Sequence, residues 1–449
     1  MRTASSSSCI RAIAHTCAAI AIAALSACSA GTTTTGASSS PQSSLGPHPS
    51  LPEPQRRLLP TVRVAKAVGW PDGQKPAAAQ DVRVSAFATG LVHPRWLYTL
   101  PNGDVLVAES NAPERPEDGK GLKSAIMKKL QARAGARIPS PDRITLLRDG
   151  DNDGVVDIRS VFIDALHSPF GMVLVGTTLY VANTDAILAF PYRTGETSIP
   201  GHGKKITDLP AGPRNHHWTK NLIATRDGKK LYVTVGSNSN VAENGLAAEA
   251  GRAAIWEVDL ASGSKRVFAS GLRNPNGMAW EPTTGALWTV VNERDELGND
   301  LVPDYLSSVK DGGFYGWPFS YYGQHPDPRV EAPKGSIAHA IEPDYALGAH
   351  VAALGLLWSA APTLPARFAN GMFVSEHGSW NRDPPVGYKV VFVPFRAGAP
   401  SGPPVDVLSG FLSATGEAWG RPVGLTFDKG GALLVADDVG NAIWRASGR

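Results

Sequence analysis

Cysteine is almost absent from this sequence, which excludes a fold held together by disulfides. Among 449 residues the cysteines are Cys9, Cys17 and Cys28, all before the first strand-like pattern. The domain must therefore be stabilised by an apolar core. An excess of one charge sign is also lacking, since 43 basic residues stand against 40 acidic ones. This balance gives no indication of a nucleic-acid partner and favours a small molecule.

Apolar runs long enough to cross a bilayer are missing as well. The run at residues 12–25 is too short to span and follows Arg2 and Arg11, as in an N-terminal targeting segment. It ends in Leu-Ser-Ala-Cys at residues 25–28, which resembles the bacterial lipobox, whose cysteine becomes linked to diacylglycerol. We expect residues 1–28 to be a lipoprotein signal peptide with Cys28 lipidated. An ordinary secretory signal is the alternative.

A lipid-modified, exported protein would be anchored in the cell envelope and face the periplasm. Ser29 rather than aspartate follows the cysteine, which favours the outer membrane. Residues 29–57 are rich in Ser, Thr, Gly and Pro without apolar periodicity, so we predict a flexible tether. About 390 residues remain in 58–449, more than a single sandwich core accommodates. Two domains or one toroidal repeat fold are the options that this length leaves.

One pattern recurs six times: a polar turn, alternating apolar residues, a turn with Gly or Pro, and a second apolar strand. Further strand-like runs follow most copies, for example residues 143–149 and 253–260. Four strands per repeat, closed radially, leave no long free edge. We therefore predict an all-β, six-bladed β-propeller with four-stranded blades over residues 58–449. The six hairpins are residues 93–110, 166–184, 216–238, 273–294, 353–378 and 420–438.

Residues 121–136 break this pattern, because they combine strong helix formers with apolar residues at helical spacing. We predict a short, basic, amphipathic helix inserted in blade one. Packing against the propeller is the ordinary interpretation of such a helix, and a lid or a membrane-surface role is the alternative.

Polar residues occupy the start of the first strand and the end of the second strand in the repeats. These two positions lie side by side in an antiparallel hairpin, so the pairs should gather on one rim. A solvated rim would explain most of the charges, but His and Arg are not typical turn residues. Cations, imidazoles and amides on one rim suit an anionic ligand and a proton acceptor. The rim residues are His93, Arg95, His167, His216, His217, Arg273, Asn274, Arg421, Glu109, Asn183, Asn238, Asn292, Glu293, Glu376, His377, Asp437 and Asp438.

Two segments resemble one known family. They are GLRNPNGMAW at residues 271–280 and GGFYGWP at residues 312–318. Together they are similar to the soluble glucose and aldose-sugar dehydrogenases that use pyrroloquinoline quinone (PQQ), and the sorbosone dehydrogenase branch fits best. The resemblance covers about residues 82–446 and implies an oxidoreductase acting on a sugar or a sugar-derived aldehyde or alcohol. A sugar substrate and a soluble or membrane electron acceptor are the implied partners.

The resemblance also implies which residues bind PQQ, a planar tricarboxylate that needs cations around it. Arg273 and Asn274 match the family's cofactor- and substrate-contacting pair at the start of blade four. Arg421 matches one of two arginines at the start of blade six, and the other aligns with Trp419. Arg382 stands near the place of a lysine in blade five.

For the reaction itself, the resemblance implies a base at the start of blade three. His217 matches this base, and His216 stands where the glucose enzyme has an aspartate that orients it. His167 lies where a glutamine approaches the sugar. Asn276 replaces the family's usual glutamine, and residues 218–221 replace a small, glycine-rich stretch, so we do not expect glucose specificity.

Calcium is the second cofactor that the resemblance implies. In the family it is bound by backbone carbonyls of the loop after the second strand of blade four, here Asn292, Glu293 and Arg294. Acidic side chains between residues 293 and 300 make that loop compatible with a hard cation, although loop solvation would explain them too.

A second calcium motif is independent of the resemblance. Residues 149–154 read DGDNDG, in which Asp149, Asp151 and Asp153 have the spacing of a calcium-binding loop with glycine at the sixth position. Asp157 occupies the ninth position, but Ser160 replaces the usual glutamate at the twelfth. We predict a weak structural calcium site here, with an unmetallated turn as the alternative.

Two other functions are compatible with a six-bladed propeller. One is a calcium-dependent hydrolase of the lactonase type, with a channel metal held by Glu109, Asn183, Asn238, Glu293 and Asp438. The rim arginines count against it, since they have no evident task in hydrolysis. The other is a non-catalytic binding propeller, which bound quinone would exclude.

Overall fold

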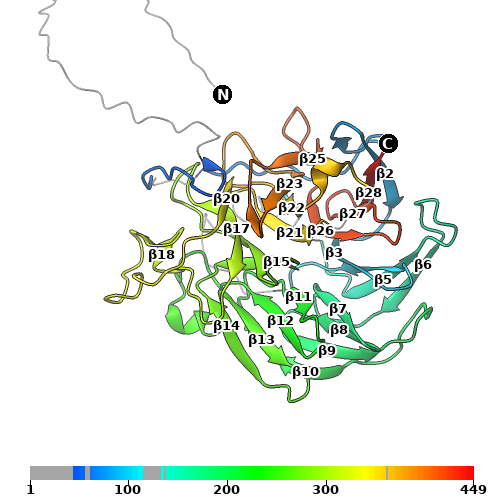
Figure 1. The fold of residues 1–449 in the computed structure, drawn as a ribbon, viewed down its shortest axis with the longest axis horizontal. Helices are drawn as coiled ribbons and strands as arrows, with labels where there is room; N and C mark the ends of the chain where they lie inside the picture. The colour runs from blue at the N-terminus through cyan, green and yellow to red at the C-terminus, as the bar shows by residue number, and fades with distance from the viewer. Residues whose placement is uncertain (1–43, 56–60, 115–132, 136–137, 360–362) are drawn as a thin grey trace, which may run out of the picture. The chain divides into compact units, whose positions relative to one another are not determined.

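Six antiparallel blades, each built on one of the predicted hairpins, form the described part of the chain (Figure 1). The computed structural model describes residues 44–55, 61–114, 133–135, 138–359 and 363–449. In five blades the four main strands pair in the order in which they occur in the sequence, and blade six takes its outermost strand from before blade one. The prediction of an all-β, six-bladed propeller is confirmed.

The blades are numbered by the order of their hairpins in the sequence. Blade one consists of β3 (Pro94–Thr99), β4 (Val105–Glu109), β5 (Arg143–Arg148) and β6 (Ile158–Ile163). Blade two consists of β7 (Met172–Val175), β8 (Thr178–Ala182), β9 (Ala186–Pro191) and β10 (Lys204–Asp208). Blade three consists of β11 (Leu222–Ala224), β12 (Lys230–Val235), β13 (Ala254–Asp259) and β14 (Lys265–Ser270).

Blades four and five carry small additions to their four main strands. Blade four consists of β15 (Asn274–Trp280), β16 (Leu287–Asn292), β17 (Pro303–Val309) and β20 (Tyr345–Ala349), with the added hairpin β18 (Ser320–Tyr321) and β19 (His325–Pro326). Blade five consists of β21 (Ala353–Trp358), β22 (Gly371–Glu376), β23 (Lys389–Arg396) and β25 (Val405–Ser409), with the added strands β1 (Ala77–Ala78) and β24 (Ala399–Pro400). Blade six consists of β26 (Pro422–Phe427), β27 (Leu433–Asp437), β28 (Ala442–Gly448) and β2 (Val82–Ala88).

The ring of blades is closed by contacts between inner strands and by a strand pairing within blade six. The inner strands β3, β7, β11, β15, β21 and β26 each contact the next one, and β26 contacts β3. Blade six combines strands from the two ends of the propeller sequence, because β2 pairs with β28, with Val82 opposite Gly448. Figure 1 shows this pairing as a blue strand beside a red one. The sequence pattern does not indicate this second closure.

The apolar core lies between the blades. The second strands β4, β22 and β27 bury every residue, because each blade packs between two others. The outermost strands β6 and β14 begin with exposed residues. Among the described residues, buried apolar side chains form six clusters, one between each pair of neighbouring blades. Trp288 of blade four, for example, packs with Met372 and Val374 of blade five.

Most of the predicted helix at residues 121–136 lies outside the described residues, which include 133–135 of it. The helices with defined bounds are two short 3-10 helices, η2 (Leu246–Glu249) and η3 (Ala366–Phe368). None of the helices in the described ranges has the length and hydropathy of a transmembrane span.

Residues 44–55, which precede the first blade, run along the propeller. Gly46 forms two backbone hydrogen bonds with Ala346 of blade four, and the Gln55 amide donates to the Leu297 carbonyl. Residues 44–55 of the predicted tether are therefore attached to blade four. The predicted signal peptide with Cys28, and the tether up to residue 43, lie outside the described residues.

Further along, the chain reaches blades five and six. Strand β1 pairs with β25 at the edge of blade five. The Trp70 ring packs against Phe411, Trp419 and Trp444, with ring centres 5.3 to 5.7 Å apart. Its Nε1 donates a 2.7 Å hydrogen bond to Asp437. Trp419, which aligns with a family arginine, thus belongs to an aromatic cluster.

Candidate active site

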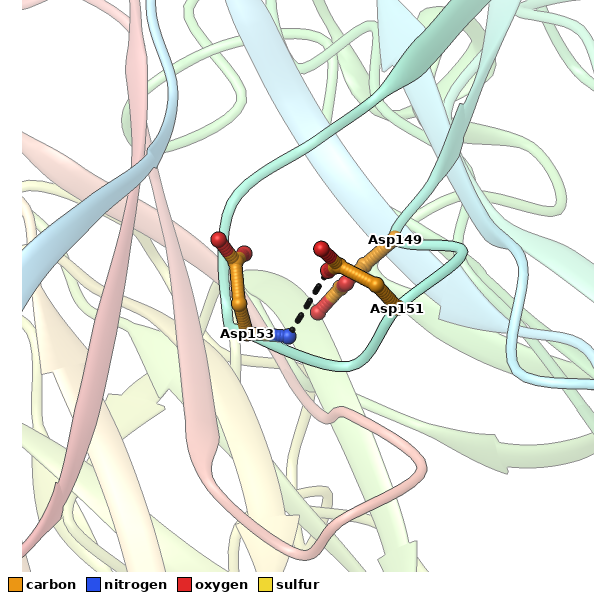
Figure 2. Close-up of side chains that lie close together, drawn as sticks. All are labelled: Asp149, Asp151 and Asp153. Carbon is orange, nitrogen blue, oxygen red and sulfur yellow. Dashed lines mark hydrogen bonds between the residues drawn. The ribbon is translucent and has the colours of Figure 1, made fainter.

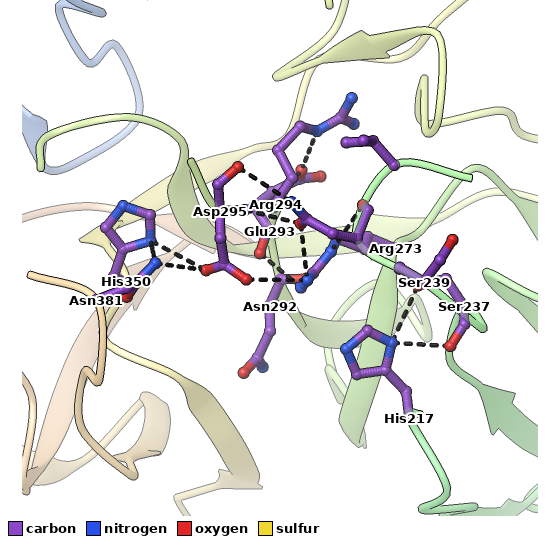
Figure 3. Close-up of polar contacts among 12 residues, drawn as sticks. His217, Ser237, Ser239, Arg273, Asn292, Glu293, Arg294, Asp295, His350 and Asn381 are labelled. Carbon is purple, nitrogen blue, oxygen red and sulfur yellow. Dashed lines mark hydrogen bonds and ion pairs between the residues drawn. The ribbon is translucent and has the colours of Figure 1, made fainter. Parts of the chain in front are cut away.

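The loops at one end of the blades bring most of the predicted site residues together. The segment before each inner strand and the loop after each second strand lie at the same end, because these two strands are antiparallel. His217 and Arg273 precede β11 and β15, whereas Asn292 ends β16 and Asp295 follows it. Figure 3 shows these side chains in and beside one polar network.

His217 is oriented by the loop that follows β12. Its Nδ1 lies 2.8 Å from the Ser237 carbonyl oxygen and 3.0 Å from Ser237 Oγ (Figure 3). A carbonyl oxygen only accepts, so Nδ1 carries the hydrogen of the neutral ring and Nε2 keeps its lone pair. Burial and the nearby Arg273 cation hold the pKa of His217 well below the ordinary value of 6.5. The imidazole is therefore neutral and basic at neutral pH.

Gly236 allows His217 and Asn274 to lie side by side. A Cβ atom at Gly236 would lie 2.4 Å from the Cβ of His217 and 2.4 Å from Oδ1 of Asn274, which is too close for any side chain. Asn274 is buried, and its Oδ1 has no hydrogen-bond partner among the described residues. A neutral imidazole thus lies next to an amide with unused hydrogen-bonding capacity.

The guanidinium of Arg273 is enclosed by five protein oxygens. Nη1 donates to the carbonyls of Glu293 at 2.7 Å and Asn292 at 3.4 Å. Nη2 donates to Asn240 Oδ1 at 3.0 Å and Asp295 Oδ2 at 3.2 Å, and Nε donates to the Asn240 carbonyl at 3.2 Å. Arginine has five N–H donors, so all of them are used within the protein.

Asp295 connects Arg273 to blade five. Its Oδ1 accepts a 2.6 Å hydrogen bond from Asn381 Nδ2 and lies 3.6 Å from His350 Nδ1 (Figure 3). Burial acts to raise the pKa of Asp295, but Arg273 and His350 bring it below its usual value. Burial acts to lower the pKa of His350, but Asp295 brings it above its usual value. We call Asn240, Arg273, Asp295, His350 and Asn381 the blade-four cluster.

Arg421 has far fewer partners than Arg273. Its Nη2 donates a 3.1 Å hydrogen bond to the Tyr388 hydroxyl, and its Cζ lies 4.9 Å from the centre of the Tyr388 ring. The side chain is buried, and Nε has no partner among the described residues. Within the part of the chain that the structure describes, one of its five N–H donors is used, so four remain for an anion.

Asp438 organises the groups next to Arg421. Its Oδ2 accepts hydrogen bonds from Arg95 Nη1 and, at 2.9 Å, from His377 Nε2, and His93 Nε2 lies 3.8 Å away. Burial acts to raise the pKa of Asp438, but His377, Arg95 and His93 bring it far below its usual value. The backbone amide of Asp438 donates to the Arg421 carbonyl. We call Arg95, His377, Tyr388, Arg421 and Asp438 the blade-six cluster.

Other predicted residues of the site lie apart from these clusters. His167 pairs with Asp185 at 2.9 Å, and its side chain is 51% exposed. Arg382 pairs with Asp300 at 2.8 Å, which ties blade five to a loop of blade four. Among the described residues, neither His167 nor Arg382 bonds to a side chain of either cluster. His216 is half-buried next to His217 in the sequence.

Two of the three carbonyls predicted to bind calcium in blade four have other partners. The carbonyls of Asn292 and Glu293 accept N–H groups of Arg273. The Glu293 carboxylate binds Arg294, whose guanidinium also binds Asp327, and these side chains are 0% exposed. Arg294 therefore anchors this loop to the segment around β18.

The acidic loop predicted to bind calcium joins β5 and β6. Asp149, Asp151 and Asp153 supply three oxygen ligands within 4.8 Å of one another (Figure 2). The Asp157 carboxylate instead accepts a 2.6 Å hydrogen bond from the Gly150 amide. By the antiparallel order of the strands, this turn lies at the end of blade one opposite to the candidate active site. Calcium binding by this loop stays a prediction.

The carboxylates expected to hold a hydrolase metal face cations instead. Glu109 binds Arg143 at 2.9 and 3.0 Å, Asp438 binds Arg95, and Glu293 binds the arginine that follows it. Within the described ranges, the acidic loop of blade one is the one group of three or more His, Cys, Asp or Glu side chains close enough to share an ion. A channel metal of the lactonase type gains no support from this arrangement.

Several cluster residues are missing from the site predicted by sequence. Arg95 and His377 are rim residues to which the sequence assigns no role, and for Asp438 it offers a role only in the hydrolase alternative. Asn240 follows the third hairpin by two residues, and His350 precedes the fifth by three. A rim defined a few residues beyond each hairpin would have included both.

A family model described as TrAA12-like matches residues 143–304 and 334–447 of the chain. An uncharacterised protein of Borreliella burgdorferi is 28% identical over 296 residues, which are 62% of this chain and 76% of that protein. A PQQ-dependent pyranose dehydrogenase of Coprinopsis cinerea is 26% identical over 231 residues, which are 41% of this chain. The match spans 31% of that enzyme's length.

Two solved structures resemble the fold. The holo form of the PQQ domain of the Coprinopsis cinerea pyranose dehydrogenase has a TM-score of 0.64 at 22% identity, covering 86% of this chain and 100% of that one. A calcium structure of a Trichoderma reesei carbohydrate-active enzyme of family AA12 has a TM-score of 0.66 at 20% identity, covering 87% and 99%. At these identities the likeness concerns the propeller fold.

Proposed function

The chain belongs to the TrAA12-like family, and from this premise we propose that it is a PQQ-dependent dehydrogenase of sugars or sugar-derived alcohols and aldehydes. The observation that carries the proposal is the unused hydrogen-bonding capacity of Arg421, at the same end of the propeller as the neutral His217. The pyranose dehydrogenase activity of the Coprinopsis cinerea relative supports the same class of chemistry. We propose more specifically that the protein belongs to the sorbosone dehydrogenase branch.

The residues present fit PQQ at the blade-six cluster. Arg95 and His377 each donate to Asp438, whereas Arg421 donates to a hydroxyl and keeps four donors for an anion. The buried Nε atoms of Arg95 and Arg421 both have no partner among the described residues. Each charge-assisted hydrogen bond to a carboxylate would contribute about 1.5 to 3 kcal/mol. When bound, PQQ supplies the acceptor for the hydride that leaves the substrate carbon.

His217 is the proposed base. The substrate O–H bond breaks as Nε2 takes the proton, while Nδ1 stays bonded to the Ser237 carbonyl. The Arg273 charge favours the neutral imidazole before the reaction, since it lowers the pKa of His217. Asn274, beside His217, has an unpaired amide oxygen that suits a sugar hydroxyl. His216 as an orienting neighbour and His167 as a sugar contact are parts of the same proposal.

A cavity with a mixed polar and apolar lining lies next to this loop, and we propose that part of the substrate occupies it. Its volume is about 410 Å³, and it lies between residues 210–214 and 238–252. Asn238 is one of its lining residues, and the Oδ1 of Asn238 is buried without a partner among the described residues. Asn238 follows Ser237, which orients His217. Amide groups and a concave surface of this size are typical of small-molecule sites.

The proposed cell location rests on the N-terminal sequence. We propose an exported protein, anchored through lipidated Cys28 and facing the periplasm, that delivers electrons to a soluble or membrane acceptor. The Cys28→Ala variant should then appear in the soluble fraction, while the parent fractionates with membranes. Membrane association that is unchanged in Cys28→Ala would overturn the lipid anchor.

An absorbance titration tests the proposed function. Purified protein should bind PQQ at one per chain, and the bound quinone should be reduced when an aldose from a panel of sugars is added. Arg421→Ala should bind weakly, and Arg396→Ala, which removes an exposed arginine of β23, is the matched control. Failure of the parent to bind PQQ would overturn the proposal.

A further inference from the structure

The five oxygens around Arg273 form the kind of ligand set that a hard divalent cation takes. They are two backbone carbonyls of the loop after β16, the carbonyl and the side-chain oxygen of Asn240, and one carboxylate oxygen of Asp295. Calcium is bound by carbonyl, amide and carboxylate oxygens of this type. Here every one of them accepts a hydrogen bond from a single guanidinium.

This cage is fixed by bonds outside it. Asn240 Oδ1 also accepts the Asp295 amide at 2.9 Å, and the Asn240 carbonyl also accepts Trp317 Nε1 at 2.9 Å. The Asp295 carbonyl accepts a hydrogen bond from Arg329 Nη1 at 2.8 Å. The other carboxylate oxygen of Asp295, Oδ1, accepts a hydrogen bond from Asn381 of blade five. The oxygens would therefore stay close together if the guanidinium were removed.

The guanidinium and a metal ion exclude each other at this place. An arginine side chain is always protonated in proteins, so its charge does not respond to pH or to ligand. Arg273 is 6% exposed, and its N–H groups use the Asn292 and Glu293 carbonyls that the family resemblance assigns to calcium. The residues present therefore do not fit a divalent ion at this loop.

We propose that Arg273 itself is the resident cation of this oxygen cage, and that shortening its side chain would turn the cage into a calcium site. The inference depends on the geometry of the apoprotein and does not require the proposed sugar oxidation. It predicts a propeller whose blade-four loop is ordered by an internal cation and is insensitive to chelators.

The first test measures bound metal in a background that lacks the acidic loop. Asp151→Asn and Asp153→Asn remove the candidate ligands of blade one, and this double variant serves as the parent. After equilibration with calcium and gel filtration, the parent should retain less than about 0.1 calcium per chain, whereas Arg273→Ala in the same background should retain about one. Arg421→Ala is the matched control, because it removes a buried arginine without opening an oxygen cage, and it should retain none.

A parent that retains one calcium per chain would overturn the inference whatever the variants do. An Arg273→Ala variant that folds and retains no calcium would overturn it as well. If Arg273→Ala folds only when calcium is present, as followed by circular dichroism, the result supports the inference. Arg273→Lys keeps a positive charge in the cage and should not gain calcium.

A second test separates this inference from the proposed function. The double-variant parent is titrated with PQQ either in calcium or in excess chelator, with absorbance as the readout. Equal PQQ binding in calcium and in chelator supports the inference, and this titration rests on the proposed function. Binding in calcium alone would overturn the inference and keep the proposed function. No binding in either would overturn the proposed function and leave the inference to the metal measurement.

Discussion

The arginines that precede the inner strands of blades four and six stand at equivalent positions of the sequence repeat, yet their surroundings differ. Arg273 donates to five protein oxygens, among them the carboxylate of Asp295. Arg421 donates to one neutral hydroxyl, that of Tyr388, among the described residues. Both side chains are buried, so the contrast lies in hydrogen bonding and not in exposure.

The difference shows that a buried cation at a repeat position can be structural or available for a ligand. The blade-four cluster satisfies its arginine internally, so it stabilises the loop that follows β16. In the blade-six cluster Arg95 and His377 both donate to one oxygen of the Asp438 carboxylate, and Arg421 is left with donors that an anion can use. Four predictions test this division, beginning with the largest expected effect.

His217→Ala should have the largest effect, because it removes the proposed base on the blade-four side and leaves the blade-six cluster intact. We expect turnover to fall by about 10² to 10⁴, while PQQ binding is retained. Stopped-flow reduction of bound quinone by a sugar substrate measures this. His202→Ala, at an exposed position of blade two, is the control, and His216→Ala should lose less than His217→Ala. Equal rates in His217→Ala and the parent would contradict the role of base.

Arg273→Ala and Arg421→Ala should differ in stability. Loss of Arg273 leaves the partly buried Asp295 carboxylate with only His350 as a cationic partner among the described residues, which costs about 3 kcal/mol in the free energy of unfolding. Loss of Arg421 removes one hydrogen bond, worth about 1 kcal/mol. Urea unfolding in the presence of chelator measures both, and chelator keeps calcium from the opened cage. Equal losses would remove the structural distinction between the clusters.

The same two positions should differ in the opposite sense in cofactor affinity. Arg421→Ala should weaken PQQ binding by about tenfold or more, because a charge-assisted hydrogen bond contributes about 1.5 to 3 kcal/mol. Arg273→Lys should change the affinity by about threefold or less, since its charge is retained and its donors face protein oxygens. Fluorescence quenching by the quinone measures both. A larger loss in Arg273→Lys would place the anion at blade four instead.

The smallest effect concerns pH. The pKa of His217 is lowered by burial and by Arg273, and the protonated ring cannot act as a base. The rate of quinone reduction should therefore fall as the pH drops through the lowered pKa, so the acid limb should lie below pH 6.5. Arg273→Met removes the charge and should move the limb to higher pH, whereas Arg273→Lys should leave it in place. A limb at or above pH 6.5 in the parent would contradict this electrostatic effect.

Much of the fold follows from the sequence, because each hairpin carries its own turn and alternating apolar residues. Residues 105–109, for example, read as a strand without any information from other blades. The pairing of β2 with β28 joins segments at opposite ends of the propeller, and no local pattern specifies it. The attachment of residues 44–55 to blade four depends on backbone hydrogen bonds, which side-chain composition does not reveal.

The site was predicted less completely, for a related reason. Strand position identifies which residues reach the rim, and His217, Arg273, Asn274 and Arg421 all lie there. Position does not give the partners, which come from loops of the same blade and of neighbouring blades. Asn240 and Asp295 approach Arg273 from two different loops, so the use of all five donors depends on the folded arrangement.

The two-ended construction of blade six has a consequence for how this chain folds. β2 is the first main blade strand to be synthesised and β28 the last, so their shared sheet must wait for the whole propeller sequence. Contacts of such large sequence separation slow folding, and until then β2 presents an unpaired strand edge of the kind that promotes aggregation. On the proposed export route, the chain would need protection from aggregation until its last strand had crossed the membrane.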